Sequence, residues 1–465
     1  MMVSHPSRHH RVGIIGAGIA GRSAAYFLRQ ELGADVEILV FEHAAHVGGR
    51  VHEREVAGVM VELGASIFHS SNRYLTHFVE MLGLHQQPSD ATETFGIWNG
   101  TSFDFTSSPS ALFTRVKMLR RYGLTPLHLQ RATQDMVKRL IQVYASQDQG
   151  QGFSTPEDLF TALGLYALTQ QSSYDYFRAS GTSERFLTEF MNGASRNNYG
   201  QDASLNAFAN LVSLAGAGMA GGYLCSVREG NSQMCQGLLR VSDATVRTEC
   251  RVRDITRVSD ANEEGWMLLL DGGETQRCDV VIIATPLESA EILIRESTLP
   301  ATAQLRRSYQ ITHVTLVEGS VQPTYFGGKT RRDIPDFILT RENAAIPFSS
   351  LEIVGNKDHP THPLYKLFSR EPVADEVLND LFVERRHVER WQWQAYPVLT
   401  PVSSWPPFQL GKELYYTNAM ESAVSTMETE VMASRNVVNL LKQDQKKHEI
   451  ASPSGESRSN TSTGL

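Results

Sequence analysis

Residues 11–28 read RVGIIGAGIAGRSAAYFL, and this stretch decides the fold that we expect. The apolar run over residues 11–15 predicts a buried strand, and apolar residues at helical spacing follow the glycines. In the G-x-G-x-x-G between them, the first glycine allows a tight turn, the second lets a pyrophosphate approach, and the third lets the helix pack closely. The residues assigned to this turn are Gly16, Gly18, Ile19, Ala20 and Gly21. This order predicts a dinucleotide-binding domain.

An acidic residue follows at the distance that such a domain requires. Residues 36–41 predict a second buried strand, and Glu42 ends it, about 20 residues beyond the loop. A carboxylate there accepts hydrogen bonds from the ribose hydroxyls of adenosine and disfavours a 2′-phosphate. This first motif does not by itself separate NAD from FAD.

Three later segments favour FAD. Val47-Gly48-Gly49-Arg50 is a second glycine turn with a cation, which suits a dinucleotide that continues past the first helix. Residues 61–69, VELGASIFH, add an acid and a turn of small residues. Residues 413–441 predict a strand, then Glu421, then a helix that begins at residues 422–423. Its N-terminus would face the flavin pyrimidine, where negative charge develops on reduction; a capping carboxylate is the other interpretation of Glu421.

The predicted fold class is α/β, with a discontinuous Rossmann-like FAD-binding domain and an interleaved α+β substrate-binding domain. Residues 280–284 predict another buried strand, which Pro286 closes. The FAD-binding domain is expected over residues 10–80, 225–290 and 408–442, the substrate domain over residues 81–224 and 291–407, and a disordered tail over residues 443–465. Two further cofactor-site candidates are Val252, in a predicted strand, and Ala423.

Composition excludes several classes of partner. The net charge is −8, from 43 basic and 51 acidic residues, so nothing points to nucleic acid or to a stable protein partner. The four cysteines form neither a disulfide framework nor the spacing of a zinc site, and no metal is expected. The N-terminal histidines His5, His9 and His10 are not read as a metal site.

Two segments bear on membranes and on location. Residues 1–10 lack the apolar run of a signal peptide, so the chain as given predicts a cytoplasmic protein. Residues 203–227 carry no charge over a length that would cross a bilayer. Because Asn206, Asn210 and Ser213 interrupt this stretch, a buried helix that runs into a loop is the preferred interpretation.

With these motifs in place, the chain resembles the prenylcysteine oxidases, also called prenylcysteine lyases, which are relatives of the flavin amine oxidases. The NNYGQ segment at residues 197–201 and the C-terminal segments are particular to that family. The resemblance is carried by IIGAGIAGRSAAYFLRQ (14–30), VGGRV (47–51), SRNNYGQDASLNAFANLVSLAGA (195–217), VREGNSQMCQGLL (227–239), IIATPL (282–287), LFSRE (367–371), WQAYP (393–397) and LYYTNAMESAVSTME (414–428).

The resemblance implies an FAD-dependent thioether oxidase with non-covalently bound FAD. Its substrate would be farnesylcysteine or geranylgeranylcysteine, left when prenylated proteins are degraded, and its products cysteine, a prenyl aldehyde and hydrogen peroxide, with oxygen as acceptor. The chemistry is reasonable because the C–H bond beside sulfur is also allylic, so that hydride transfer leaves a cation stabilised from both sides. Animal members enter the secretory route, which makes the lysosome or endomembrane lumen the alternative location.

The chain departs from the family at two positions near the expected flavin. Glu229 stands where the family usually has the first glycine of Gly-Gly-Asn, and Ala419 where it has the glycine of Gly-Ile-Glu. If the backbone at Ala419 needed a positive φ, the methyl group would cost stability and shift the flavin.

Four residues are candidates for the catalytic site, and each has a structural alternative. His69 either positions water or tunes the flavin, or it is a histidine that is hydrogen-bonded in the core. Tyr199 and Gln201 either line the substrate face or fix a buried turn, and Asn198 would place a polar end of the substrate.

Two further segments have a substrate-related interpretation. Trp393 and Tyr396 would form an aromatic wall of the prenyl slot or belong to the core. In residues 112–123, LFTRVKMLRRYG, apolar side chains share one face of a helix with basic residues mostly on other faces. A solvated helix face and a peripheral contact with a membrane are the two interpretations.

Two other functions remain open at this point. A flavin amine oxidase or a carotenoid-type desaturase would use the same scaffold on another substrate. A catalytically inactive interaction protein with an FAD fold would follow if Glu229 and Ala419 spoiled the flavin site.

Overall fold

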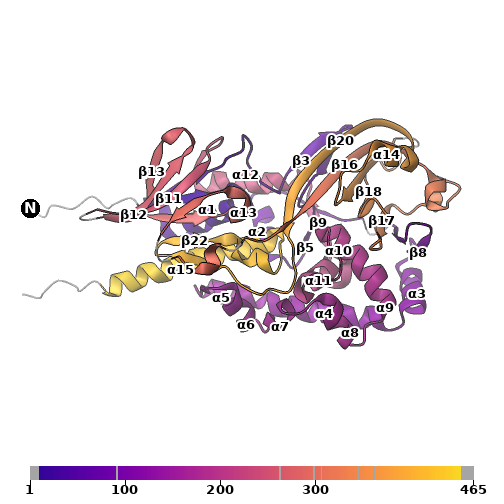
Figure 1. Ribbon diagram of the computed structural model, residues 1–465, viewed down its shortest axis with the longest axis horizontal. Helices are drawn as coiled ribbons and strands as arrows, with labels where there is room; N and C mark the ends of the chain where they lie inside the picture. Colours follow the sequence, from indigo (N-terminus) through magenta and orange to yellow (C-terminus); the bar gives the residue numbers. More distant parts are fainter. Residues whose placement is uncertain are drawn as a thin grey trace, which may run out of the picture.

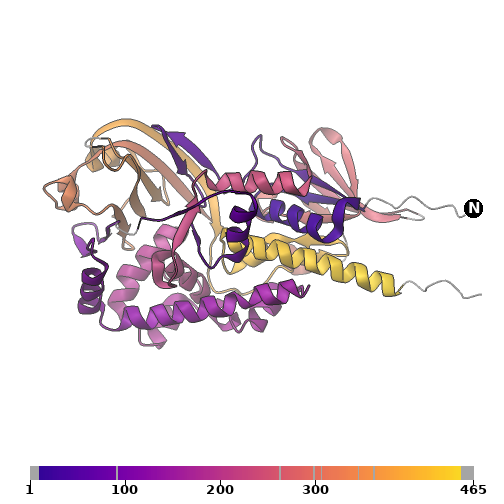
Figure 2. The same ribbon diagram turned by 180° about the vertical axis from the view of Figure 1, so that it is seen from behind.

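A computed structural model describes residues 10–90, 93–260, 263–296, 299–304, 306–343, 345–359 and 362–451. The elements form two lobes side by side (Figures 1 and 2). One lobe holds β22 (Leu414–Tyr416), α1 (Ile19–Leu32) and α15 (Met427–Ala451), and the other holds a long curved sheet above a layer of helices.

The first lobe is built on a six-stranded sheet. Its order is β10 (Thr245–Arg247), β2 (Val36–Phe41), β1 (His10–Ile15), β14 (Val280–Ile283), β22 (Leu414–Tyr416) and β21 (Gln409–Gly411). Neighbouring strands pair in parallel, except that β21 is antiparallel to β22. The predicted strands over residues 11–15, 36–41 and 280–284 are confirmed within one residue at each end, as is the α/β Rossmann-like class. The first glycine motif therefore lies at the carboxyl edge of the sheet, where such folds bind ligands.

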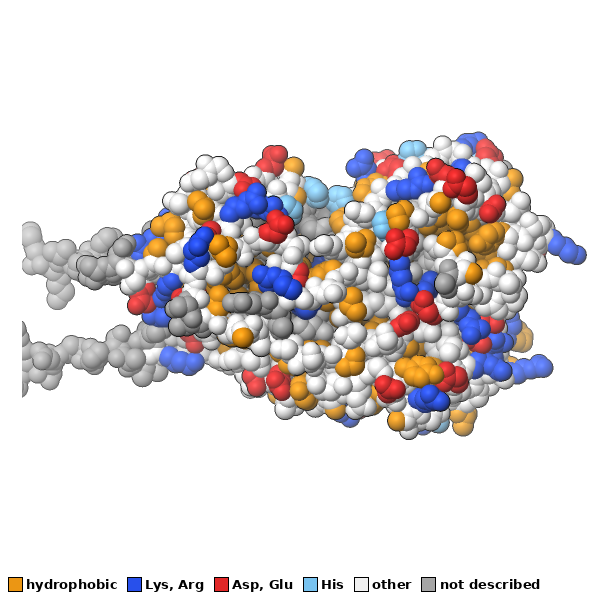
Figure 3. Space-filling view, in the orientation of Figure 1, with side chains coloured by type: hydrophobic (Ala, Val, Ile, Leu, Met, Phe, Trp, Pro, Cys, Tyr) orange, Lys and Arg blue, Asp and Glu red, His pale blue; other side chains and the backbone are white. Residues whose placement is uncertain are grey.

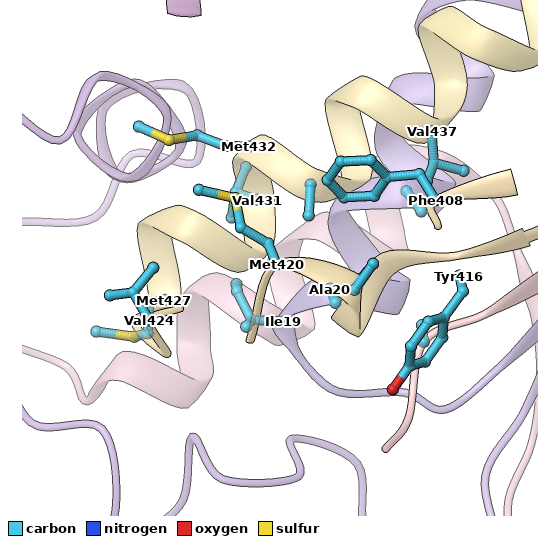
Figure 4. Packing of buried hydrophobic residues seen from close by; sticks show 14 of the residues in the cluster. Ile19, Ala20, Phe408, Tyr416, Met420, Val424, Met427, Val431, Met432 and Val437 are labelled. Carbon is cyan, nitrogen blue, oxygen red and sulfur yellow. The ribbon is translucent and has the colours of Figure 1, made fainter. Parts of the chain in front are cut away.

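Three helices pack beside this sheet: α1 (Ile19–Leu32), α12 (Asn231–Ser242) and α15 (Met427–Ala451). Figure 4 shows Ile19 and Ala20 of α1 among apolar side chains from α15 and the segment before it. Ser434 Oγ donates a hydrogen bond to the Ala20 carbonyl at 2.8 Å. The C-terminal helix thus fixes the start of α1, where the glycine motif ends.

Smaller sheets flank the first lobe. A four-stranded sheet has the order β13 (Thr275–Cys278), β12 (Glu263–Leu270), β11 (Val252–Asp260) and β15 (Leu293–Arg295). A hairpin joins β3 (Glu53–Val56) to β4 (Val59–Glu62), and β9 (Leu224–Val227) pairs with β5 (Phe68–His69) and β6 (Gln86–Pro88). Two short helices complete this part, α2 (Arg73–Met81) and α13 (Leu287–Ala290).

A seven-stranded sheet dominates the second lobe. Its order is β20 (Phe382–Pro397), β16 (Tyr309–Val321), β19 (Leu364–Ser369), β18 (Ser350–Gly355), β17 (Phe337–Thr340), β7 (Phe95–Trp98) and β8 (Phe103–Thr106). Alternate residues point to opposite faces of a strand. Ile338, Leu351 and Leu367 accordingly pack into a separate core, which also takes residues of α14 (Asp375–Leu381). The other face turns toward the helices and bears the side chains discussed below.

The helical layer comes from the middle of the chain. Its members are α3 (Ala111–Tyr122), α4 (Thr125–Leu140), α5 (Gln142–Asp148), α6 (Pro156–Ala162), α7 (Tyr166–Thr169), α8 (Ser173–Ala179), α9 (Glu184–Phe186), α10 (Asn192–Tyr199) and α11 (Ala207–Leu214). The uncharged residues 203–227 form buried α11, a wide turn and β9, which confirms the buried-helix interpretation. Among the residues described, no helix combines the length and the hydropathy needed to cross a membrane.

Two predictions about the C-terminal segment were wrong. The chain forms a 3-10 turn over Thr417–Ser422, and α15 begins at Met427 rather than at residues 422–423. The expected disordered tail is also wrong for residues 443–451, which continue α15. Asp444 is held there by hydrogen bonds from Gln409 Nε2 at 2.7 Å and the Tyr415 hydroxyl at 2.9 Å, which compensate for the scarcity of apolar residues. Residues 452–465 lie outside the described residues.

Candidate functional site

The first glycine turn leaves a helix N-terminus facing open space. A Cβ at Gly16 would lie 2.6 Å from the Ala284 carbonyl, and one at Gly21 would lie 2.0 Å from the Gly16 carbonyl, so the turn accepts no side chain at either position. A Cβ at Gly18, by contrast, would meet only the Gly48 carbonyl, at 3.9 Å. Among the described residues, no side chain caps the N-terminus of α1. Amide groups of its first turn, which begins Ile19-Ala20, are therefore available to an anion.

Glu42 is buried beside this turn. Its carboxylate accepts hydrogen bonds from the backbone N–H groups of Ala17 at 2.8 Å and Ala44 at 3.0 Å. The backbone at Glu42 also contacts the chain just before β11, since the N–H of Cys250 donates to the Glu42 carbonyl at 2.8 Å. Val252, two residues on, is buried where β11 begins. A fixed carboxylate at the end of β2 fits the ribose of a dinucleotide.

The second glycine turn packs directly against the first. The Gly48 N–H donates to the Ala17 carbonyl at 3.1 Å, and Gly48 and Gly49 have φ values of +137° and +57°. Arg50 follows and donates from Nη1 to the Ala395 carbonyl of β20 at 2.8 Å. The turn therefore joins the first lobe to the large sheet.

Arg50 also forms an ion pair with Glu421, whose side chain has no exposed surface. The Glu421 carboxylate accepts further hydrogen bonds from the Tyr309 hydroxyl at 3.0 Å and Ser425 Oγ at 2.9 Å. Burial alone would raise the pKa of Glu421, but Arg50 and Arg307 hold it below its usual value. Glu421 is thus an ionised residue between the second glycine turn and the start of α15.

The N-terminus of α15 opens onto a cavity of about 480 Å³. Thr426 caps the helix, since its Oγ1 accepts from the Thr429 N–H at 3.1 Å. Ile19, Arg50 and Met427 line the same cavity. A dinucleotide that follows the first glycine turn and passes the second would reach this point, so the described residues fit FAD. Ala423 is buried behind the helix start and does not line the cavity.

The cavity continues under the large sheet, where its walls are mainly apolar. β17 contributes Phe337 and Leu339, β19 contributes Phe368, and Phe95 and Phe190 lie edge to face with ring centroids 6.0 Å apart. A slot of this kind accepts a long apolar group.

The candidates from NNYGQ separate into two groups. Tyr199 lines the cavity and packs edge to face on Tyr396, with centroids 5.1 Å apart. Burial raises the pKa of both hydroxyls, so both are neutral at pH 7. Asn198 also lines the cavity and donates from Nδ2 to Ser213 Oγ at 2.8 Å. Trp393 completes this group.

Gln201 and His69 do not line the cavity. The Gln201 amide accepts from the Leu399 N–H at 2.8 Å and donates to the Pro397 carbonyl at 3.0 Å, which holds a buried turn. The ring nitrogens of His69 contact Ser71 Oγ at 2.7 Å and the Gly221 carbonyl at 2.5 Å.

The two departures from the family pattern leave the cradle intact. Ala419 is not among the residues with positive φ; it sits in the 3-10 turn, where alanine is unstrained. Glu229 is at the surface, where its carboxylate contacts His85 Nδ1 at 2.5 Å, and the positive φ of +98° belongs to Gly230. The structural reason for expecting an inactive protein is therefore absent at these two positions.

Sequence reasoning missed five charged residues that line the cavity: Asp90, Glu93, Glu352, Lys366 and Glu430. One signal was available, because Lys366 interrupts the otherwise mainly apolar strand LYKLFS, over Leu364–Ser369. A lysine in such a strand either lies at the edge of a sheet or is buried together with a charged partner.

The dinucleotide cradle and the adjoining apolar cavity define a flavin-dependent oxidoreductase with the fold of the flavin amine oxidases. The structure of a cyclohexylamine oxidase from Brevibacterium oxydans superimposes with a TM-score of 0.63 at 16% identity, over 94% of this chain and 100% of that one. The model of the NAD(P)-binding Rossmann-like domain matches residues 14–82.

The chain belongs to the prenylcysteine lyase family, whose model matches residues 105–452. It is 34% identical to a farnesylcysteine lyase of Arabidopsis thaliana, over 92% of this chain and 87% of that protein. It is 30% identical to prenylcysteine oxidase 1 of Bos taurus, over 92% of this chain and 88% of that protein. The resemblance recognised in the sequence motifs is thereby confirmed.

Proposed function

We propose that this protein holds FAD non-covalently and oxidises the thioether of a prenylcysteine, with oxygen as the final electron acceptor. The observation that carries the proposal is the cavity, which runs from Arg50 and the start of α15 to the apolar walls at Phe95 and Phe190. The names of the relatives support a prenylated cysteine as substrate and favour it over the amine oxidase and desaturase alternatives.

The reaction requires no protein nucleophile. Bound flavin supplies a hydride acceptor for the C–H bond beside sulfur. Water adds to the resulting cation, and the hemithioacetal loses the thiol to give cysteine and an aldehyde. One oxygen molecule and one water are consumed for each hydrogen peroxide formed. The task of the chain is to align the thioether and limit access of water. Tyr199, Tyr396 and Trp393 line the cavity and are positioned to form an aromatic wall beside the thioether.

Anaerobic mixing of the purified holoprotein with farnesylcysteine tests the proposal. We expect the oxidised flavin absorbance to bleach, and farnesal and hydrogen peroxide to appear when air is admitted. Bleaching by simple amines but not by the thioether would instead assign the protein to the amine oxidases.

A peripheral membrane contact through α3 is a second part of the proposal. Leu112, Phe113, Val116 and Leu119 are 68, 65, 54 and 40% exposed on this helix. Residues 105–134 contain no acidic residue. Figure 3 shows Lys and Arg side chains projecting at the end of the molecule where Figure 1 places α3. Apolar side chains flanked by cations suit a surface of anionic lipid.

The α3 surface makes a direct prediction. The triple variant Leu112→Ser, Phe113→Ser, Val116→Ser should bind vesicles of phosphatidylcholine and phosphatidylserine at least about 10-fold more weakly than wild type in a flotation assay. Its matched control is Met60→Ser with Val383→Ser, which removes apolar side chains that are 55 and 66% exposed elsewhere. Equal flotation of the triple variant and the wild type would leave α3 as a solvated helix.

A further inference from the structure

A charged group is built into the apolar cavity of the second lobe. Lys366 is 5% exposed, and its Nζ lies 3.6 Å from Glu352 Oε2. The two residues are cross-strand partners on β19 and β18, so register and pleat fix them on one face of the sheet. Phe337 is the cross-strand partner of Glu352 on the next strand, which places the charges directly beside the apolar wall.

Glu93, just before β7, adds a second carboxylate to this group. Burial, together with the charge of Glu352, raises the pKa of Glu93 to about 7. Lys357 lowers this pKa, and Asp336 and Asp90 raise it further. Lys357 lies 3.3 Å from Asp336 and 3.6 Å from Asp90, so its charge is already shared. The carboxylates lining the cavity near Lys366 therefore outnumber its single ammonium group.

The sheet orders these features along the cavity. β20 meets the second glycine turn through Arg50, β19 and β18 carry Lys366 and Glu352, Glu93 precedes β7, and β17 and β7 carry Phe337, Leu339 and Phe95. An amphiphile with a small charged head and a long apolar tail matches the charged and the apolar residues of this cavity. An ionised head without partners here would pay a large desolvation cost, whereas opposite charges at fixed positions offset it.

We propose that Lys366, Glu352 and Glu93 form the binding site for the zwitterionic amino-acid head of the substrate. Lys366 Nζ binds the α-carboxylate, and Glu93 and Glu352 bind the α-ammonium group. This assignment rests on the proposed function, since it takes a prenylcysteine as the ligand. It implies selection of the free amino acid over peptides and esters, because an amide or ester removes one of the two charges.

Four thioethers with the same farnesyl group test the assignment: farnesylcysteine, S-farnesylcysteamine without the carboxylate, S-farnesyl-3-mercaptopropionate without the ammonium, and farnesyl methyl sulfide without either. In the wild-type holoenzyme, loss of one charge should lower kcat/KM by about 10- to 100-fold. Lys366→Met should lower kcat/KM for farnesylcysteine to the value for S-farnesylcysteamine. Glu93→Gln should lower kcat/KM for farnesylcysteine toward the value for S-farnesyl-3-mercaptopropionate, with Glu352 keeping part of the ammonium preference. Lys329→Met, at an exposed lysine of the same lobe, should keep the wild-type preferences.

Flavin absorbance and circular dichroism confirm that each variant is folded. Lys366→Met leaves the charge of Glu352 without its partner and could therefore fail to fold. The double variant Lys366→Met with Glu352→Gln leaves neither charge of the pair, and it must show the same loss of preference for substrates with a carboxylate. Retention of the wild-type preference in either folded variant overturns the assignment.

The head-group site and the proposed function fail in different ways. If wild type oxidises all four thioethers with equal kcat/KM, the head-group site is wrong and the thioether oxidase stands. If wild type oxidises none of the four thioethers, the proposed oxidase activity is wrong. In that case, thermal stabilisation of wild type by farnesylcysteine that is lost in Lys366→Met would still support the head-group site. If farnesylcysteine does not stabilise wild type either, both the activity and the head-group site are rejected.

The pH dependence gives an independent readout. An ionised Glu93 binds an ammonium group and a protonated one does not, so KM for farnesylcysteine should fall as the pH rises through about 7. The groups that set this value are Glu352, Lys357, Asp336 and Asp90. Glu93→Gln should remove the inflection and leave a flat KM over this range. An unchanged inflection would assign the titration to another group and exclude Glu93 from the site.

Discussion

Replacing Gly18 by valine should remove flavin from the protein and leave the polypeptide folded. Gly18 has φ −75° and ψ −174°, which any residue adopts, and a Cβ there meets only the Gly48 carbonyl at 3.9 Å. The added side chain would instead occupy the space through which a pyrophosphate approaches the start of α1. We expect the dissociation constant for FAD to rise by at least about 100-fold, measured by titrating apoprotein with FAD and following flavin fluorescence.

Gly21→Ala is the matched comparison. A Cβ at this position would lie 2.0 Å from the Gly16 carbonyl and 3.2 Å from Ile14 Cγ2, so it must separate α1 from β1. This variant should lower the melting temperature of the apoprotein, whereas Gly18→Val should not. If Gly18→Val binds FAD as tightly as wild type, the first glycine turn does not hold the pyrophosphate.

Replacing Arg50 by methionine should destabilise the folded protein by about 3–5 kcal/mol, the usual cost of removing one partner of a buried ion pair. Glu421 has no exposed surface, and without Arg50 its charge would keep the hydrogen bonds from Tyr309 and Ser425 and the attraction of Arg307, but no direct ion pair with Arg50. The substitution also removes the hydrogen bond to the Ala395 carbonyl. Urea unfolding of the apoprotein at pH 7 measures the difference.

A second substitution and the pH dependence identify the cause. Adding Glu421→Gln to Arg50→Met should restore most of the lost stability, because the carboxylate that loses its ion-pair partner is then neutral. The pKa of Glu421 lies below its usual value of about 4.3, so the pair stabilises the fold above that pH, and the contribution is lost as the pH falls through the lowered pKa. Arg50→Met should show a smaller acid-range loss, because only Arg307 then lowers the pKa of Glu421 by its charge. A variant as stable as wild type would show that solvent already compensates Glu421.

The cofactor cradle could be predicted from the sequence because its signals are local. A strand, three glycines, a helix and Glu42 follow one another within residues 11–42, and each constrains the next. The start of α15 was misplaced for a local reason as well. Thr426 and Thr429 cap each other reciprocally, whereas Ser422 and Ala423 belong to a 3-10 turn that helical periodicity does not distinguish from a helix.

The substrate end could not be predicted in the same way. Glu352 and Lys366 lie on successive strands, β18 and β19, but Glu93 is distant from both in the chain and joins them only through the order of strands β7, β17, β18 and β19. Both faces of these strands are largely buried, so alternation of polar and apolar residues, the usual signal for the outer face, is weak. Tyr199 became a candidate through the NNYGQ segment of the family resemblance, and Tyr396 through its position just before the C-terminal flavin segment.

The seven-stranded sheet places contacts to the cofactor-binding lobe and the apolar wall of the cavity on different strands. β20, at one edge, contacts the second glycine turn through Ala395, and β16 contacts Glu421 through Tyr309, whereas β17 and β7 lie three or more strands further along. At a strand spacing of about 4.8 Å, this is a separation of roughly 15 Å or more. Protein engineering can exploit that distance. Replacing Phe95 or Phe190 with a smaller side chain should enlarge the apolar part of the cavity and change the accepted tail length without touching the redox centre.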